Sequence, residues 1–170
     1  MAIIHGLLRR RTCAITVAAL FGASSFVFAS DPRVVPLEER IQGTDVVVVA
    51  TPSSVRANWQ ENAFGDRLIV SRYVLQVHET LKGMPSQAVS VDLEGGTLDG
   101  FTMRVSSLPS LAPGERAVFF LDGASSGGAY HAHLKGLGIL KLDEQDVVKG
   151  SSLTLGEIRR SAAAVAAVAK

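Results

Sequence analysis

The sequence predicts a mainly β domain, a closed or partly open barrel of five to seven strands, with a short helix before the strands and a second helix after them. Apolar and polar residues alternate over several short segments, which is typical of strands with one buried face. Turns that contain glycine or proline separate these segments at near-regular spacing. This spacing favours a barrel or a sandwich over a parallel α/β sheet.

The domain begins with a short helix and an apolar strand. We expect a helix over residues 37–42, because a proline lies near its start and a glycine just past its end. Residues 46–50 contain four consecutive valines, which indicates a strand buried on both faces or lying in a barrel wall. Pro52 predicts a bulge or an edge position, after which residues 54–59 continue the strand. Residues 60–66 are polar and contain a glycine, so they form a hairpin loop.

The middle of the chain contains the strands with the clearest alternation. The strand expected from Leu68 to Leu81 places on one face Ile69, Tyr73, Leu75, Val77 and Leu81, and on the other Arg72, Gln76, His78 and Thr80. The remaining expected strands are residues 89–94, 101–105, 117–121, 130–134 and 138–142. Because turn residues connect all of them, a barrel or a sandwich is expected rather than a parallel α/β sheet.

A helix is expected to end the domain. Thr154 and Glu157 have the spacing of a capping box, in which each side chain accepts a hydrogen bond from a backbone N–H that would otherwise lack a partner. Apolar residues then recur on one face at Leu155, Ile158 and Ala162. This pattern predicts a helix that packs against the barrel.

The N-terminal segment resembles a targeting signal. Met1–Arg11 is basic, Thr12–Phe28 is apolar, and Val27 and Ala29 precede a plausible cleavage site before Ser30. These features predict a signal peptide over residues 1–29 and a single exported domain over residues 30–170, with its core at about 37–160. An uncleaved anchor is the alternative, but the apolar run is shorter than the ~20 residues that span a bilayer. We expect a periplasmic or extracellular protein without a membrane span after cleavage.

Removal of this segment changes the charge and the available chemistry. The full chain of 170 residues has 17 basic and 16 acidic residues, and its only cysteine is Cys13. Residues 30–170 carry 14 basic and 16 acidic residues, because residues 1–29 contain three arginines and no acid. The exported domain therefore has no disulfide, no cysteine nucleophile and no cysteine-based zinc site.

Several segments resemble a known superfold. They are TDVVVVATPSSV, RYVLQVHETLKG, AVSVDLEGGTLDG, SLPSLAPGERAVFFL and LTLGEIRRSA. In this order they resemble small exported bacterial proteins with a five-stranded OB-type barrel, akin to the tissue-inhibitor-of-metalloproteinases and netrin-module superfold. The resemblance extends from about Leu37 to Arg160. Its identifying features are the end of a strand at Leu81–Gly83, the turn at Gly95-Gly96 and the corner at Pro113–Arg116.

The resemblance implies a protein-binding role, with a secreted metalloprotease as a candidate partner. The animal inhibitors of that superfold use an N-terminal cysteine, held by disulfides, to bind the zinc of the protease. Residues 30–170 contain no cysteine, so this chemistry is assigned to no residue of the domain.

The first hairpin loop carries the candidate binding residues. Trp59 and Phe64 flank this loop, with Arg56 and Arg67 nearby, and aromatic residues beside arginine are typical of protein-binding hot spots. Loops of an OB-type barrel often contribute to ligand binding. Alternatively, either ring folds over the end of the barrel as a cap. For Phe64 the cap is the expected arrangement, and for Trp59 both arrangements stay open.

A histidine pair allows a different hypothesis. His131 and His133 would share one face of a strand, which is compatible with two metal ligands, and His78 or Asp122 could supply a third. Two ligands alone do not define a metal site. The favoured interpretation is therefore two exposed histidines on a strand whose Leu134 points inward.

Other function classes find little support in the sequence. The exported domain is slightly acidic and has no cluster of lysine and arginine, which argues against nucleic-acid binding. It lacks a G-x-S-x-G nucleophile elbow and a phosphate-binding loop. We therefore expect a non-enzymatic, exported protein-binding module without a cofactor. A metal-binding protein that uses His131 and His133, or a structural envelope protein, is the alternative.

Overall fold

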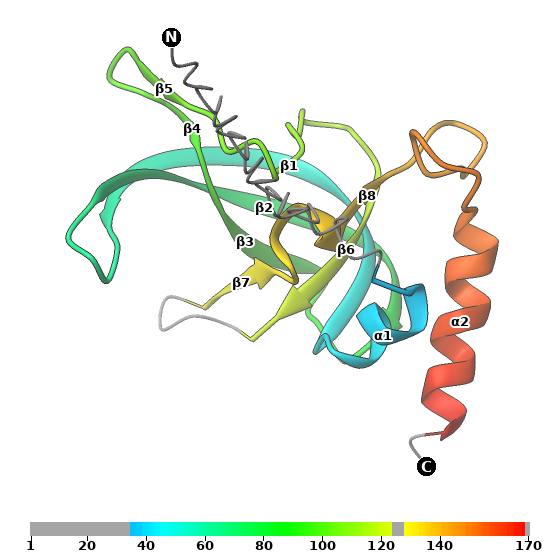
Figure 1. Ribbon diagram of the computed structural model, residues 1–170. Coiled ribbons are helices and arrows are strands. Elements are labelled where there is room, and N and C mark those ends of the chain that lie inside the picture. Colours follow the sequence, from blue (N-terminus) through cyan, green and yellow to red (C-terminus); the bar gives the residue numbers. More distant parts are fainter. Residues whose placement is uncertain (1–34, 124–127, 169–170) are drawn as a thin grey trace, which may run out of the picture. The chain divides into compact units, whose positions relative to one another are not determined.

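The computed structural model describes residues 35–123 and 128–168, so the predicted signal peptide at 1–29 lies outside the described residues. The described residues belong to one compact unit. Its elements in chain order are α1 (Leu37–Gln42), β1 (Val46–Glu61), β2 (Arg67–Lys82), β3 (Ala88–Glu94), β4 (Gly96–Leu98), β5 (Phe101–Met103), β6 (Ala117–Asp122), β7 (Ala129–Ala132), a 3₁₀ helix (Lys135–Gly138), β8 (Ile139–Lys141) and α2 (Leu155–Val168) (Figure 1).

Five strands close into an irregular ring, which confirms the mainly β, OB-like fold class. Their order is β1-β2-β3-β7-β6, and β6 pairs again with β1. All these pairs are antiparallel except β3 with β7. The ring is irregular because β7 is short and because β1 changes register three times against β2. One of these changes lies between Pro52 and Ser54, as the proline predicts.

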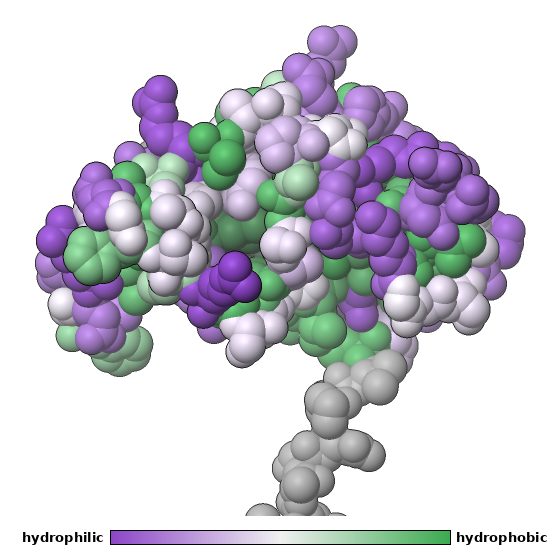
Figure 2. Space-filling model, turned by 90° about the horizontal axis from the view of Figure 1, so that it is seen from above, coloured by the Kyte–Doolittle hydropathy of each residue, from purple (hydrophilic) through white to green (hydrophobic). Residues whose placement is uncertain are grey.

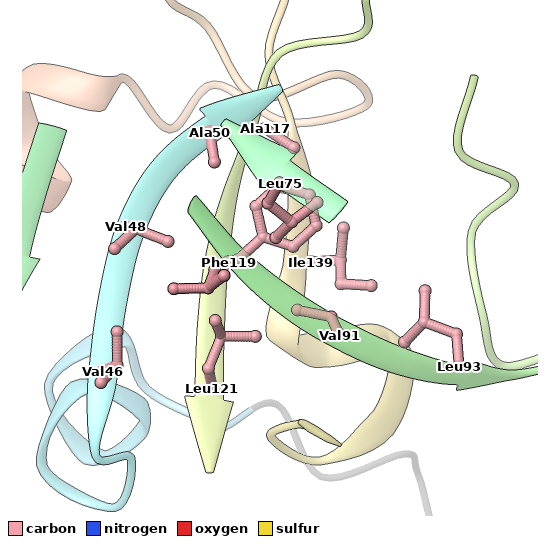
Figure 3. Close-up of a cluster of buried hydrophobic side chains, with 11 residues drawn as sticks. Val46, Val48, Ala50, Leu75, Val91, Leu93, Ala117, Phe119, Leu121 and Ile139 are labelled. Atoms are coloured by element: carbon pink, nitrogen blue, oxygen red, sulfur yellow. The ribbon is translucent and has the colours of Figure 1, made fainter. Parts of the chain in front are cut away.

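The first half of β1 is buried on both faces, as expected from its valine run. Val46, Val48 and Ala50 point into the ring, where they meet Leu75, Val91 and Phe119 (Figure 3). Val47 and Val49 point to the outside of the ring and belong to a second cluster. Because side chains alternate along a strand, one short segment supports two cores.

The two helices cover the outside of the ring at β1 and β6. The second core contains Ile41 of α1, Val118 and Phe120 of β6, and Leu155, Ile158 and Ala162 of α2. In Figure 1, α1 and α2 lie on the same side of the sheet. Lys82, at the end of β2, donates hydrogen bonds to the carbonyl oxygens of Ile41, Gln42 and Thr44. These bonds hold the end of α1 against the sheet, since the last carbonyl groups of a helix have no partner within it.

Local interactions fix the start and the position of α2. The predicted capping box is present: Glu157 Oε2 accepts from Thr154 N at 2.8 Å, and Glu157 N donates to Thr154 Oγ1 at 3.2 Å. Arg159 forms a bidentate pair with Glu79 of β2, with distances of 2.8 and 2.7 Å. The helix therefore begins where the sequence predicts and is tied to the barrel by a charge pair. No helix of the described residues is long and apolar enough to cross a membrane.

Two parts of the fold differ from the expectation. The described residues contain eight strands rather than five to seven, because β4 and β5 form a separate two-stranded hairpin and β8 pairs with β6 beyond the end of β7. The strand expected at 130–134 ends at Ala132. Leu134 and Lys135 have positive φ angles of 50° and 57°, which turn the chain into the 3₁₀ helix. Leu134 is 45% exposed rather than inward-pointing. Leucine and lysine rarely adopt this conformation, so the sequence pattern did not predict the turn.

The ring core makes a direct prediction about stability. We expect Phe119→Ala to lower the free energy of unfolding by about 3–5 kcal/mol, because it removes a fully buried ring and leaves a cavity. Phe64→Ala is the matched control, since the Phe64 ring is 90% exposed, and its effect should stay within about 0.5 kcal/mol. Urea unfolding followed by circular dichroism measures both. Equal effects of the two substitutions would contradict the two-core packing.

The pair of Arg159 and Glu79 makes a prediction about pH. Hydrogen bonds from Arg159 lower the pKa of Glu79 below its ordinary value of 4.5. A carboxyl whose pKa is lower in the folded state stabilises the fold at pH values above its unfolded-state pKa. This contribution is lost as the pH falls through the folded-state pKa. Glu79→Gln should therefore be slightly less stable than the natural chain at pH 7 and equally stable near pH 2. Denaturant midpoints measured across this range test it, and a difference that persists at pH 2 would show another cause.

Candidate functional site

The β1–β2 hairpin extends beyond the ring. β6 pairs with β1 only from Val46 to Ala50, whereas β2 continues to pair with β1 as far as Glu61. From residue 53 to residue 61, no residue of β1 is buried. In Figure 1 the far part of this hairpin arcs away from the ring. This arm carries all four residues that the sequence analysis selected for partner binding.

Trp59 is held in place on this arm by three neighbours. Its Nε1 donates to Asp99 Oδ2 at 3.0 Å. The Arg67 guanidinium lies 4.5 Å from the centre of the indole ring, and the Phe101 ring packs edge-on at 6.0 Å between centroids. A cation above the face of the indole and a T-shaped contact with a second aromatic ring are both favourable. The structure thus brings Trp59 into contact with Arg67, which the sequence places near it, and with Phe101.

Phe101 is a residue that the sequence analysis did not select. It is 64% exposed and follows the turn between β4 and β5. Asp99 and Gly100 both have positive φ angles, 52° and 79°, and Leu98 pairs with Phe101. A two-residue loop with both φ angles positive is a type I′ turn, which Asp-Gly favours because glycine adopts this conformation without strain. The Asp-Gly pair was the signal that could have located this hairpin.

Phe64 is presented by a well-ordered turn rather than folded over the barrel. Asn62 Oδ1 accepts hydrogen bonds from the backbone N–H groups of Phe64 and Asp66, both at 2.9 Å. Asn62 N also donates to the Asp66 carbonyl at 3.0 Å. The Phe64 ring is 90% exposed, so the expected cap was wrong. The local hydrogen bonds of Asn62 fix the loop without help from the ring.

Arg56 lies on the same arm, away from Trp59. Its direct neighbour across the β1–β2 pair is Arg72. Arg72 makes a bidentate ion pair with Asp92, with both distances 2.7 Å. Among the described residues, Arg56 has no ion pair or side-chain hydrogen bond that would satisfy its guanidinium, and it is exposed. Arg56 is therefore an available cation on a fixed strand.

A hollow of about 490 Å³ lies beside the arm, lined by residues of β2, β3, β4, β5 and the loop that follows β5. Ser71 Oγ donates to the Gly95 carbonyl at 2.6 Å. A Cβ at Gly96 would lie 2.3 Å from Ser71 Oγ, so the close approach of β4 to β2 requires glycine at this position. Burial raises the pKa of Tyr73, whose ring forms part of the lining. Figure 2, seen from above, shows green apolar surface within a hollow between white and purple residues.

The two histidines proposed as metal ligands have different environments. His131 is exposed on β7, in register with Asp92 of β3. His133 lies beyond the end of β7, and its side chain is 14% exposed. Its Nδ1 lies 2.8 Å from Asp122 Oδ2, and its ring packs against Gly43 at the end of α1. His133 thus has a structural partner on β6.

The suggested third ligands do not complete a metal site around this pair. His78 Nε2 lies 2.7 Å from Thr51 Oγ1 on the β1–β2 pair. Asp122 pairs with His131 along the β6–β7 ladder, but its carboxylate hydrogen-bonds to His133. Within residues 35–123 and 128–168, no group of three or more histidine, aspartate or glutamate residues is placed to hold a metal ion.

No protein-family model matches the sequence, and no curated protein matches it. The arrangement of the described residues is therefore the basis of the functional proposal. The feature that stands out is the set of side chains at the ends of the two hairpins. We call Trp59, Phe64, Arg67 and Phe101 the hairpin-tip surface.

Trp59 is the only tryptophan in the chain, so its fluorescence reports on this surface. We expect Phe101→Ala to shift the emission of Trp59 to longer wavelength and to increase its quenching by acrylamide, because the substitution removes a ring that packs against the indole. Phe64→Ala should leave the emission unchanged, since no contact between Phe64 and Trp59 is found. Unchanged emission in Phe101→Ala would contradict the packing of the two hairpins.

Proposed function

We propose that this chain is a non-enzymatic protein-binding module that is exported and that contacts its partner through the hairpin-tip surface. The observation that carries the proposal is the exposure of two phenylalanine rings, Phe64 at 90% and Phe101 at 64%, on turns whose backbones are fixed by local hydrogen bonds and turn geometry. Burial of a phenylalanine ring is worth roughly 1.5–3 kcal/mol. Two such rings on one partner-facing surface would supply much of the affinity of a moderate complex.

The fixed geometry of Trp59 also supports this proposal. Interface hot spots are enriched in tryptophan, tyrosine and arginine, and they bind best where little conformational freedom is lost. Trp59 is positioned by Asp99, Arg67 and Phe101 before any partner arrives. Trp59 is therefore preorganised, so binding would cost little further conformational entropy at this side chain.

The class of partner follows from the sequence. The segment at 1–29 has the pattern of an export signal, and the resemblance to the metalloproteinase-inhibitor superfold makes a secreted protease the first partner to test. The exported domain has no cysteine for zinc binding. Contact through the hairpin-tip surface, with no ligation of the protease zinc, is what we propose for such a complex.

The proposal is tested by photo-crosslinking in the native compartment. A photo-crosslinking amino acid placed at position 64 or 101 should give a discrete cross-linked complex. The same amino acid at position 84 is the matched control, because Met84 is 99% exposed but lies beyond the other end of the β1–β2 hairpin. Mass spectrometry of the complex identifies the partner.

Substitutions measure the energetic contribution of the same surface. With the cross-linked partner purified, Phe64→Ala and Phe101→Ala should each weaken binding at least fivefold, as expected for truncation of a hot-spot ring. Met84→Ala should leave the affinity unchanged. If all three variants bind equally well, or if position 84 cross-links as strongly as position 64, the hairpin-tip surface is not the binding site.

A further inference from the structure

The second half of β1 has a free edge. The pairing of β1 with β6 ends at Ala50, and the Gly114 N–H reaches the Pro52 carbonyl at 3.0 Å. Beyond this point, the backbone of Ser54–Glu61 pairs with β2 on one side, and in the described part of the chain no other strand pairs with it on the other side. A strand edge of this kind is a template for an additional strand.

The direction of the free backbone groups follows from the hairpin register. Asn62 N donates to the Asp66 carbonyl, so residues 62 and 66 form a hydrogen-bonded pair. Hydrogen-bonded and non-hydrogen-bonded pairs alternate along an antiparallel ladder. Every second residue before Asn62 therefore directs its backbone N–H and C=O groups to β2; these residues are Ser54, Arg56, Asn58 and Gln60. The N–H and C=O groups of Val55, Ala57, Trp59 and Glu61 therefore point outward, away from β2.

The charge of the edge indicates what kind of strand it accepts. Arg56 lies directly across from Arg72, and like charges in this position repel. Asp92 neutralises Arg72 with two hydrogen bonds, whereas Arg56 has no carboxylate partner among the described residues. A strand added along the free edge would place one side chain directly opposite Arg56, and a carboxylate there would form an ion pair.

We propose that the edge from Ser54 to Glu61 binds an extended, acidic segment of a partner protein as an additional β-strand. This inference rests on the proposed function and gives the partner segment its chemistry: main-chain hydrogen bonds for affinity and a carboxylate opposite Arg56 for register. The edge is continuous with the hairpin-tip surface, because Trp59 belongs to both. The partner strand therefore leads directly to the exposed ring of Phe101, which contacts Trp59.

A second copy of this chain is a less suitable occupant. Two antiparallel β1 edges centred on Arg56 would place the two Arg56 side chains opposite each other, and this repulsion disfavours the pairing. Pro52 and the register change after it also limit the length of the edge to about eight residues. Arg56 thus selects an acidic strand and opposes self-association.

The first experiment uses two synthetic peptides. Each has nine residues that alternate threonine and valine, with either glutamate or lysine at the centre. Hydrogen exchange of the backbone amides is followed by NMR on the folded domain. The glutamate peptide should slow exchange at least tenfold at residues 55, 57, 59 and 61, and leave residues 56, 58 and 60 unchanged. The lysine peptide should bind about two- to fivefold more weakly, and Arg56→Glu should reverse this preference.

Two variants test the backbone itself. Ala57→Pro removes an outward N–H, and proline is tolerated in an edge strand where the N–H faces solvent. It should abolish protection by the peptide and weaken binding of the cross-linked partner at least tenfold. Ala57→Ser keeps the N–H and should bind like the natural chain. Circular dichroism and the emission of Trp59 verify that both variants are folded.

The outcomes separate this inference from the proposed function. Loss of partner binding in Phe64→Ala and Phe101→Ala, with full binding in Ala57→Pro, would overturn strand addition and keep the protein-binding function. Unaltered partner binding in all these variants would overturn both. Protection of residues 55, 57, 59 and 61 without any peptide, in a dimer that Ala57→Pro dissociates, would make a second copy the occupant and overturn the acidic segment.

Discussion

The pairing of β6 with the first five residues of β1 is the constraint on which the rest of the structure depends. It closes the ring of five strands, and without it β1, β2 and β3 would form an open sheet with one exposed apolar face. The residues of this pair are buried on both sides, Val46, Val48 and Ala50 toward the ring and Val47 and Val49 toward the helices. The same five residues therefore determine both the barrel and the position of α1 and α2.

The end of this pairing also creates the candidate binding region. Because β6 is short, β1 continues for eleven residues beyond Ala50, and in the described part of the chain β2 is its one strand partner there. The extended arm cannot be stabilised by the barrel core, so it needs other contacts. The β4–β5 hairpin supplies them: Asp99 and Phe101 contact Trp59 of the arm, and Gly96 lies close to Ser71 of β2. Contacts that hold the arm in place are thus the contacts that arrange the aromatic side chains.

The sequence predicted those parts of the fold in which local pattern and tertiary structure agree. The valine run, the long alternating strand and the capping box at Thr154 and Glu157 each became the expected element, because burial and local hydrogen bonds favour the same conformation. The strand expected at 130–134 ends at Ala132, because Leu134 and Lys135 adopt positive φ angles, which their side chains disfavour. No local pattern reveals a turn that tertiary contacts impose.

The candidate site was predictable only in part, for a related reason. Trp59, Arg67 and Phe64 lie at or beside a loop that its polar residues reveal, so the sequence alone placed them on one hairpin. Phe101 comes to Trp59 from a hairpin 42 residues further along the chain, and alternation alone does not indicate which hairpins meet. The exposure of Phe64 likewise depended on Asn62, whose side chain orders the turn so that the ring is not needed to cover it.

An exposed strand edge beside exposed aromatic rings is a hazard for an isolated protein, since such edges promote aggregation. Three features of the chain counter it: Pro52 and the register change limit the edge at one end, the Asn62 turn closes it at the other, and Arg56 places an uncompensated charge at its middle. A chain that needed only protection could have shortened β1 or covered it. Here the strand stays long, its backbone stays accessible and its aromatic residues stay ordered. This combination is what a surface that must remain open for a specific acidic strand requires, because the charge that repels another copy is the charge that attracts the partner.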